Sequence, residues 1–125
     1  MRSINPRSSI LALIFTFGFL PQVASAELRC GWVDNPTPAN WWLTDRDGEW
    51  ILSVQGVGDQ DNGFSDIPND WNFQDQWRET NGSYGYGCGC FEGKVDKATN
   101  WVSEVTALTA KSLAVCESDL ALPAR

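Results

Sequence analysis

The acidic residues and the cysteines are the side chains in this sequence that could carry chemistry. The 125 residues include sixteen acidic residues and four cysteines, but no histidine. Without imidazole there is no Ser–His or Cys–His nucleophilic pair and no histidine-bound metal. A hydrolase with two carboxylates remains a candidate, with Asp47 and Glu49 as the pair. Because turns favour aspartate for backbone reasons, we expect a turn here and a protein that is not an enzyme.

The four cysteines are expected to form two disulfides. Cys88 and Cys90 alternate with glycine on a predicted strand, so both point the same way and each needs a distant partner. If Val95 faces Trp101 across a hairpin, position 88 faces 108 and position 90 faces 106, which brings Cys116 nearer to Cys88. This geometry favours the pairs Cys30–Cys90 and Cys88–Cys116, with Cys30–Cys88 and Cys90–Cys116 as the alternative.

Metal binding is the rival interpretation of the same residues. The C-x-C spacing with two distant cysteines is not that of a zinc ribbon. Residues 59–63, Asp-Gln-Asp-Asn-Gly, resemble half of a calcium loop, but they lack the third ligand before the glycine and the glutamate six residues after it. We therefore expect no metal and no cofactor.

The first 26 residues predict export. Arg2 and Arg7 precede an apolar run over residues 10–20, and Ala24-Ser25-Ala26 follows as a small-residue cleavage site. The run is shorter than the roughly 20 residues that span a bilayer. We predict a helical signal peptide over 1–26 and one domain over 27–125. After cleavage the domain would be periplasmic or secreted, without membrane association.

The composition of residues 27–125 indicates which partners the domain could bind and which residues could form its core. This region keeps all sixteen acidic residues but only seven basic ones, a formal charge of −9. Such a surface repels nucleic acid and attracts a basic partner. Leu, Ile, Val and Phe number only 19 of its 99 residues, whereas it holds seven tryptophans and all four cysteines. We expect indole rings and disulfides to stabilise this small domain.

Turn signals predict antiparallel strands. Two β-prone runs, 41–44 and 49–54, flank Asp45-Arg46-Asp47-Gly48, and an Asp-Gly turn between such runs is a strong hairpin signal. Asn81-Gly82 predicts a second tight turn, followed by a long strand to about Lys94 and a returning strand over 101–110.

The remaining segments carry weaker signals. Residues 56–75 predict a long surface loop with a helical turn near 70–76, and the tail over 111–125 predicts one helical turn near 118–122. No segment beyond the signal peptide has helical periodicity. The fold class is therefore all-β: a small antiparallel barrel or sandwich-like domain of five or six disulfide-stapled strands, expected to be a monomer.

Residues 84–90, Tyr-Gly-Tyr-Gly-Cys-Gly-Cys, leave one face of their strand bare. Gly85, Gly87 and Gly89 share that face. Glycine weakens a strand unless something occupies the space. Either an aromatic ring covers the bare face within the core, or the face lines a ligand groove.

The combination of three sequence blocks resembles a known family. The blocks are Cys-Gly-Trp at 30–32, Asn-Pro-Thr-Pro at 35–38 and the Tyr-Gly-Tyr-Gly-Cys segment at 84–88. They are similar to small exported bacterial proteins catalogued as domain of unknown function 4087. The resemblance implies a Gram-negative periplasmic or secreted protein with four cysteines. It supplies no catalytic residue and no ligand.

Three functions follow in order of preference. The first is a non-enzymatic binding protein whose aromatic residues and acidic loops contact a protein, for example an envelope inhibitor of a basic cell-wall hydrolase. The second is a glycan-binding domain in which exposed Trp41, Trp42, Trp71 or Trp77 stacks on sugar rings. The third is the two-carboxylate hydrolase.

Overall fold

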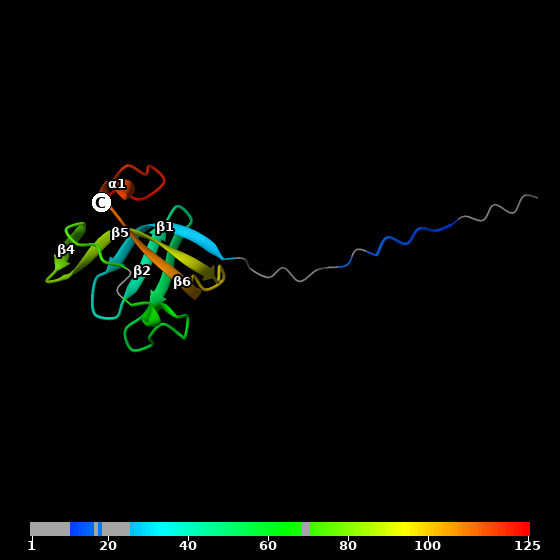
Figure 1. Ribbon diagram of the computed structural model, residues 1–125, viewed down its shortest axis with the longest axis horizontal. Coiled ribbons are helices and arrows are strands. Elements are labelled where there is room, and N and C mark those ends of the chain that lie inside the picture. Colours follow the sequence, from blue (N-terminus) through cyan, green and yellow to red (C-terminus); the bar gives the residue numbers. More distant parts are fainter. Residues whose placement is uncertain (1–10, 17, 19–25, 69–70) are drawn as a thin grey trace, which may run out of the picture.

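The computed structural model describes residues 11–16, 18, 26–68 and 71–125 (Figure 1). Six strands, one 3-10 helix and one short α-helix lie within these ranges. They are β1 (Glu27–Asn35), β2 (Trp41–Asp45), β3 (Gly48–Ser53), η1 (Phe64–Asp66), β4 (Trp77–Asn81), β5 (Tyr84–Val95), β6 (Val102–Lys111) and α1 (Leu113–Glu117).

All strand pairs are antiparallel and belong to one sheet in the order β3-β2-β1-β5-β4, with β6 also paired to β5. The long strand β5 is therefore the centre of the domain. One of its edges pairs with β1 over nine positions, and its other edge is shared by β4 and β6. The predicted all-β antiparallel class is confirmed.

The sheet does not close into a barrel. Between β3 and the start of β6 there is an isolated bridge, which joins Ile51 to Trp101, the residue before β6. Beside this bridge the buried amide of Asn62 donates hydrogen bonds to the carbonyls of Leu52 and Val102, each at 3.0 Å. A loop side chain thus satisfies backbone groups that strand pairing would satisfy in a closed barrel.

Both predicted tight turns are present. Gly48 has a φ of +137° and Gly82 a φ of +58°, a region that residues with a Cβ rarely adopt. At the first turn the Asp45 carboxylate also accepts a hydrogen bond from the Asp47 N–H at 2.8 Å. These turns join β2 to β3 and β4 to β5, which fixes the antiparallel pairing on both sides of the sheet.

The sheet has a core on each face. The larger core gathers around buried Val33, Leu43, Trp50, Leu52 and Phe91. The opposite face carries a smaller core of Trp32, Cys88, Leu113 and Cys116, where α1 and the C-terminal tail cover the sheet. The Trp32 indole N–H donates a 2.8 Å hydrogen bond to the carbonyl of Pro123, which ties the tail to this face.

The disulfides join Cys30 to Cys90 and Cys88 to Cys116, the pairs that the hairpin geometry favoured. The first links directly opposed positions of β1 and β5, and the second holds α1 against β5. The register behind that argument was wrong, however. Two bulges shift the β5–β6 ladder, so position 88 faces Lys111 rather than 108, and position 90 faces Thr109 rather than 106.

Two predicted helical turns are also wrong. Residues 71–76 form no helix, and 69–70 lie outside the described residues. In the tail the helix begins at Leu113, five residues before the predicted turn, because Leu113 and Cys116 share the face that is buried.

The predicted signal peptide falls largely outside the described residues, and residues 11–16 contain no helix. No helix within the described ranges has the length and apolar content to cross a membrane.

Candidate functional site

Aromatic side chains cover the glycine face of β5. A Cβ at Gly87 would lie 2.8 Å from the Phe73 ring and 3.0 Å from the Trp77 ring, and a Cβ at Gly89 would lie 3.4 Å from the Trp71 indole nitrogen. The glycines therefore make room for rings that lie directly on the strand. Of the two explanations that the sequence allowed, the aromatic cover is the correct one at these positions.

Five rings meet over this face and are called the aromatic cluster below. Neighbouring ring centroids are 5.0–6.3 Å apart, and the ring planes are inclined by 36–63°. These distances suit favourable aromatic pairing. The cluster consists of Trp41, Phe64, Trp71, Phe73 and Trp77.

Backbone and indole hydrogen bonds hold the cluster in place. The Trp71 N–H donates to the carbonyl of Cys90 at 3.2 Å, and the Trp77 N–H donates to the carbonyl of Ser83 at 3.0 Å. The side-chain oxygen of Asn62 accepts from the Phe64 N–H at 2.8 Å. The bond from Trp71 anchors the segment before β4 to β5, and the bond from Trp77 ties β4 to the β4–β5 turn.

Asp59 orders the start of the same loop. Its carboxylate accepts hydrogen bonds from the backbone N–H groups of Ser65 and Asp61, both at 3.0 Å. The bond from Ser65 is the main cause that lowers the pKa of Asp59 below its usual value. The acidic segment that resembles half of a calcium loop thus gives its first carboxylate to a turn.

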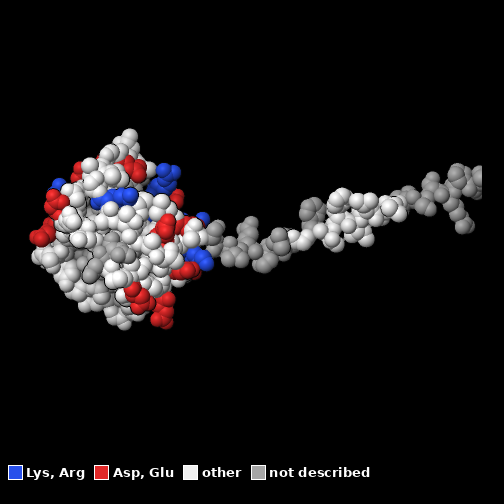
Figure 2. Space-filling view, in the orientation of Figure 1, with Lys and Arg blue, Asp and Glu red and all other residues white. Residues whose placement is uncertain are grey.

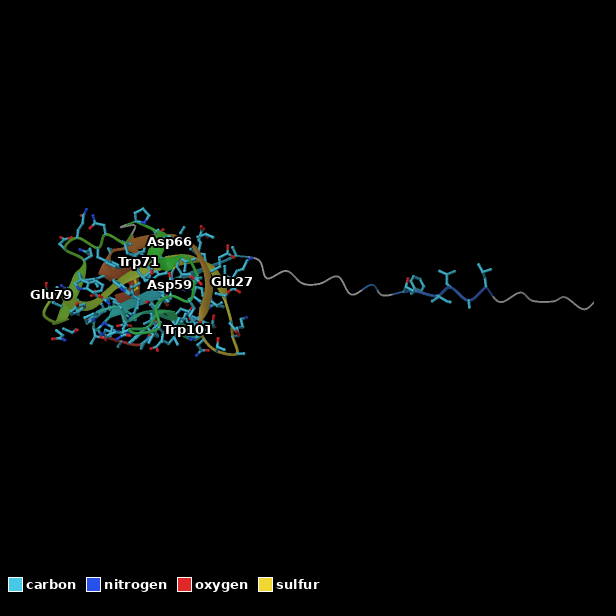
Figure 3. The ribbon with its side chains drawn as sticks, turned by 90° about the horizontal axis from the view of Figure 1, so that it is seen from below. Glu27, Asp59, Asp66, Trp71, Glu79 and Trp101 are labelled. Carbon is cyan, nitrogen blue, oxygen red and sulfur yellow. A yellow bond between two sulfur atoms is a disulfide. The ribbon has the colours of Figure 1, made fainter. Side chains whose placement is uncertain are left out.

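The cluster is only partly buried, and three acidic residues lie close to its rings along the chain. Phe73 is buried, whereas the other four rings are half-buried and reach solvent. Asp66, Asp75 and Glu79, called the acidic rim below, are exposed, and each lies within two residues of a cluster ring along the chain. Figure 2 shows acidic side chains scattered along the edges of the domain, and Figure 3 labels Asp66 and Trp71 on the same part of the domain and Glu79 at its far end.

The structure brings together three of the four tryptophans that the sequence analysis selected for ligand binding. Trp41, Trp71 and Trp77 belong to the cluster. Trp42 does not, because alternation along β2 places it on the opposite face, opposite Asp34 of β1. Sequence reasoning missed Phe64 and Phe73, since neither lies in a segment with strand or helix periodicity.

A second group of polar residues lies under the β2–β3 hairpin. The Arg29 guanidinium, 8% exposed, is 2.9 Å from Asp45, 3.2 Å from Asp47 and 2.6 Å from Glu27. It lies 4.2 Å from the centre of the Trp50 ring, and the Trp50 indole N–H donates to Asp45 at 3.0 Å. The Arg29 guanidinium and its neighbours are therefore held together by ion pairs, a cation–π contact and a hydrogen bond.

Opposing effects act on the pKa of Arg29. Burial alone would lower the pKa, but the hydrogen bond and charge of Asp45, with hydrogen bonds from Asp47 and Glu27, hold it above its usual value. Asp47 therefore faces a cation, whereas Glu49 lies on the face of β3 opposite Trp50. The hairpin does not place these two carboxylates as a facing pair.

Fold and site together define a small, disulfide-bonded, antiparallel β domain with a half-buried aromatic cluster and an acidic rim. The chain belongs to the family described as protein of unknown function (DUF4087), whose model matches residues 24–123. No curated protein and no solved structure matches the chain.

Proposed function

We propose that this protein is an exported, non-catalytic binding module that recognises a basic protein through the aromatic cluster and its acidic rim. The two disulfides are consistent with an oxidising environment such as the periplasm or the cell exterior. A concrete form of this function is inhibition of a basic cell-wall hydrolase, which an acidic module would attract and block.

The distribution of ion pairs is the observation that carries this proposal. Among the described residues, three of the seven basic side chains are paired, and they occupy five carboxylates. Ten acidic side chains and four basic ones have no ion pair there, and nearly all of them are exposed. The surface offered to a partner is therefore strongly acidic, which steers basic partners towards it.

The aromatic cluster supplies the contact area that charge alone does not. Indole rings are frequent at the energetically dominant positions of protein interfaces. A lysine or arginine of the partner can lie over a Trp ring while it meets a rim carboxylate, so both attractions act on one side chain. The rings are mutually inclined by at least 36°, so the cluster offers no flat platform for a sugar chain.

Neutralising the rim tests the proposal against a matched control. The rim variant is Asp66→Asn, Asp75→Asn and Glu79→Gln together. The control carries the same change in charge on the face covered by α1, namely Glu92→Gln, Glu117→Gln and Asp119→Asn. The probe is a purified basic muramidase, with binding followed by calorimetry and cell-wall lysis as the second measurement.

We expect the rim variant to weaken binding about tenfold or more and the control to change it much less, because attraction depends on where the charges lie. Binding should also weaken as salt is raised, since the screening length falls from about 10 Å at 0.1 M to about 3 Å at 1 M. Equal loss in both variants would reduce the effect to net charge, and absence of binding to basic proteins would refute the proposal.

A further inference from the structure

Trp101, like Trp42, differs from the five tryptophans that stabilise the domain. Trp32 and Trp50 are buried, and the three cluster tryptophans pack against the larger core. Trp101 is half-buried, yet within the described part of the chain it joins neither core, pairs with no other ring and makes no indole hydrogen bond. Packing therefore does not account for a large apolar side chain at this position.

The backbone around Trp101 is fixed on both sides. The Trp101 carbonyl accepts from the Asp96 N–H at 2.8 Å, and its N–H donates to the Thr99 hydroxyl at 3.3 Å. The preceding carbonyl, of Asn100, accepts from the Ile51 N–H of β3 at 2.8 Å. The backbone of Trp101 is thus held beside β3, directly before β6, without any ligand.

A cleft of about 460 Å³ opens beside this ring. This volume lies within the range of small-ligand pockets, about 300–1,000 Å³. Besides the indole, its lining is mainly polar. It consists of Gln60, Asp96, Thr99, Trp101, Val102 and Ser103.

Several polar groups of the cleft remain available to a ligand. One carboxylate oxygen of Asp96 accepts from the Ala98 N–H at 2.9 Å, which leaves the other oxygen without a partner among the described residues. The side chains of Gln60 and Ser103 make no hydrogen bond there either. A carboxylate, an amide and a hydroxyl therefore line the same cleft as an aromatic ring, and Asp96 is the only charged residue of that lining.

We propose that this cleft binds a neutral sugar ring, stacked on Trp101 and hydrogen-bonded through its hydroxyl groups to Asp96 and Gln60. A sugar ring has an apolar face of C–H groups and an edge of hydroxyls, which matches an indole beside planar polar side chains. The negative charge of Asp96 disfavours acidic sugars. The site is separate from the aromatic cluster: Figure 3 shows Trp101 and Trp71 on different parts of the domain.

Nuclear magnetic resonance of the indole N–H groups tests this inference directly. The purified protein is titrated to about 10 mM with two neutral probes, the trimer of N-acetylglucosamine and maltotriose, and the seven indole signals are assigned with single Trp→Phe variants. We expect the Trp101 signal to move with at least one probe, with a dissociation constant near the millimolar range that single-ring contacts give.

Three variants make the result specific. Measured by calorimetry with the same sugar, Trp101→Ala should abolish binding, and Gln60→Ala should weaken binding several-fold while the fold, checked by thermal unfolding, is retained. Trp42→Phe changes another half-buried indole and should leave binding unchanged. A Trp101 signal that ignores both sugars overturns the inference. A response confined to Trp71 or Trp77 also overturns it, because the sugar then binds at the aromatic cluster.

Discussion

Arg29 is a buried cation held by three carboxylates beneath an indole ring. Removing one partner of a buried ion pair leaves an uncompensated charge, which typically costs about 3–5 kcal/mol. Because Asp47 and Glu27 remain near Arg29, we expect Asp45→Asn to lower the free energy of unfolding by about 3 kcal/mol, measured by urea denaturation.

The neighbouring carboxylate provides the control for that measurement. Asp47 also contacts Arg29 but is 59% exposed. Exposed ion pairs contribute about 0–1 kcal/mol, so Asp47→Asn should have an effect in that range. If both variants lose the same stability, burial does not set the strength of this charge cluster.

Asp34 gives the domain a defined pH dependence. Burial raises its pKa, although the hydrogen bonds and charge of Arg125 act in the opposite direction. Since the unfolded value is about 3.9, the folded protein binds this proton more tightly. The contribution of Asp34 to the free energy of unfolding is therefore full below about pH 3.9 and is lost as pH rises through the folded pKa.

Unfolding at several pH values isolates that contribution. Relative to Asp34→Asn, the wild type should lose stability as pH rises from about 3 to about 6. Asp66→Asn, which removes an exposed carboxylate without an ion pair, is the control. A wild-type stability that rises relative to Asp34→Asn over this range would show that Arg125 dominates over burial.

At the scale of elements, strand prediction succeeded where turn chemistry is strong. Gly48 and Gly82 marked their hairpins because a positive φ is nearly reserved for glycine at these turns. Strand β1 was not predicted, because the buried polar residues Arg29, Asp34 and Asn35 interrupt its apolar pattern. The sequence also contains no local signal for the two bulges of the β5–β6 ladder, so its register could not be predicted.

The disulfide from Cys88 to Cys116 should be needed mainly to keep α1 packed on the sheet. It holds α1 on β5, and α1 covers part of the smaller core beside Trp32. Replacing both cysteines with alanine should free residues 112–125 for early proteolysis and expose Trp32, because the five-residue helix is too short to be stable alone. Limited proteolysis with mass spectrometry measures this.

The other disulfide supplies the comparison for that experiment. Cys30 and Cys90 are opposed on strands that also pair at eight other positions, so hydrogen bonds keep β1 on β5 without the sulfur link. The double alanine variant at these positions should be less stable overall but should retain a protected tail. Early tail cleavage in both variants would mean that α1 depends on global stability rather than on its own cross-link.

For the whole molecule, composition predicted the means of stabilisation only in part, because five of the eight buried residues of the larger core are valine or leucine. Few aliphatic residues implied reliance on indoles and disulfides, and both cores contain tryptophan. The aromatic cluster could be anticipated only in part, because a long loop without periodicity contributes three of its rings. Trp101 gave no signal at all, because only the fold brings the other residues of its cleft beside it.

The order of the four cysteines has a consequence for how the protein matures. The first to emerge during synthesis, Cys30, belongs with the third, and the second belongs with the fourth. Cys30 and Cys88 are the first two cysteines available to an oxidant that acts on the growing chain. A disulfide between them is non-native and must be broken before the native pairs can form. Correct maturation therefore requires either that β1 finds β5 before oxidation or that an isomerase reshuffles the first bond.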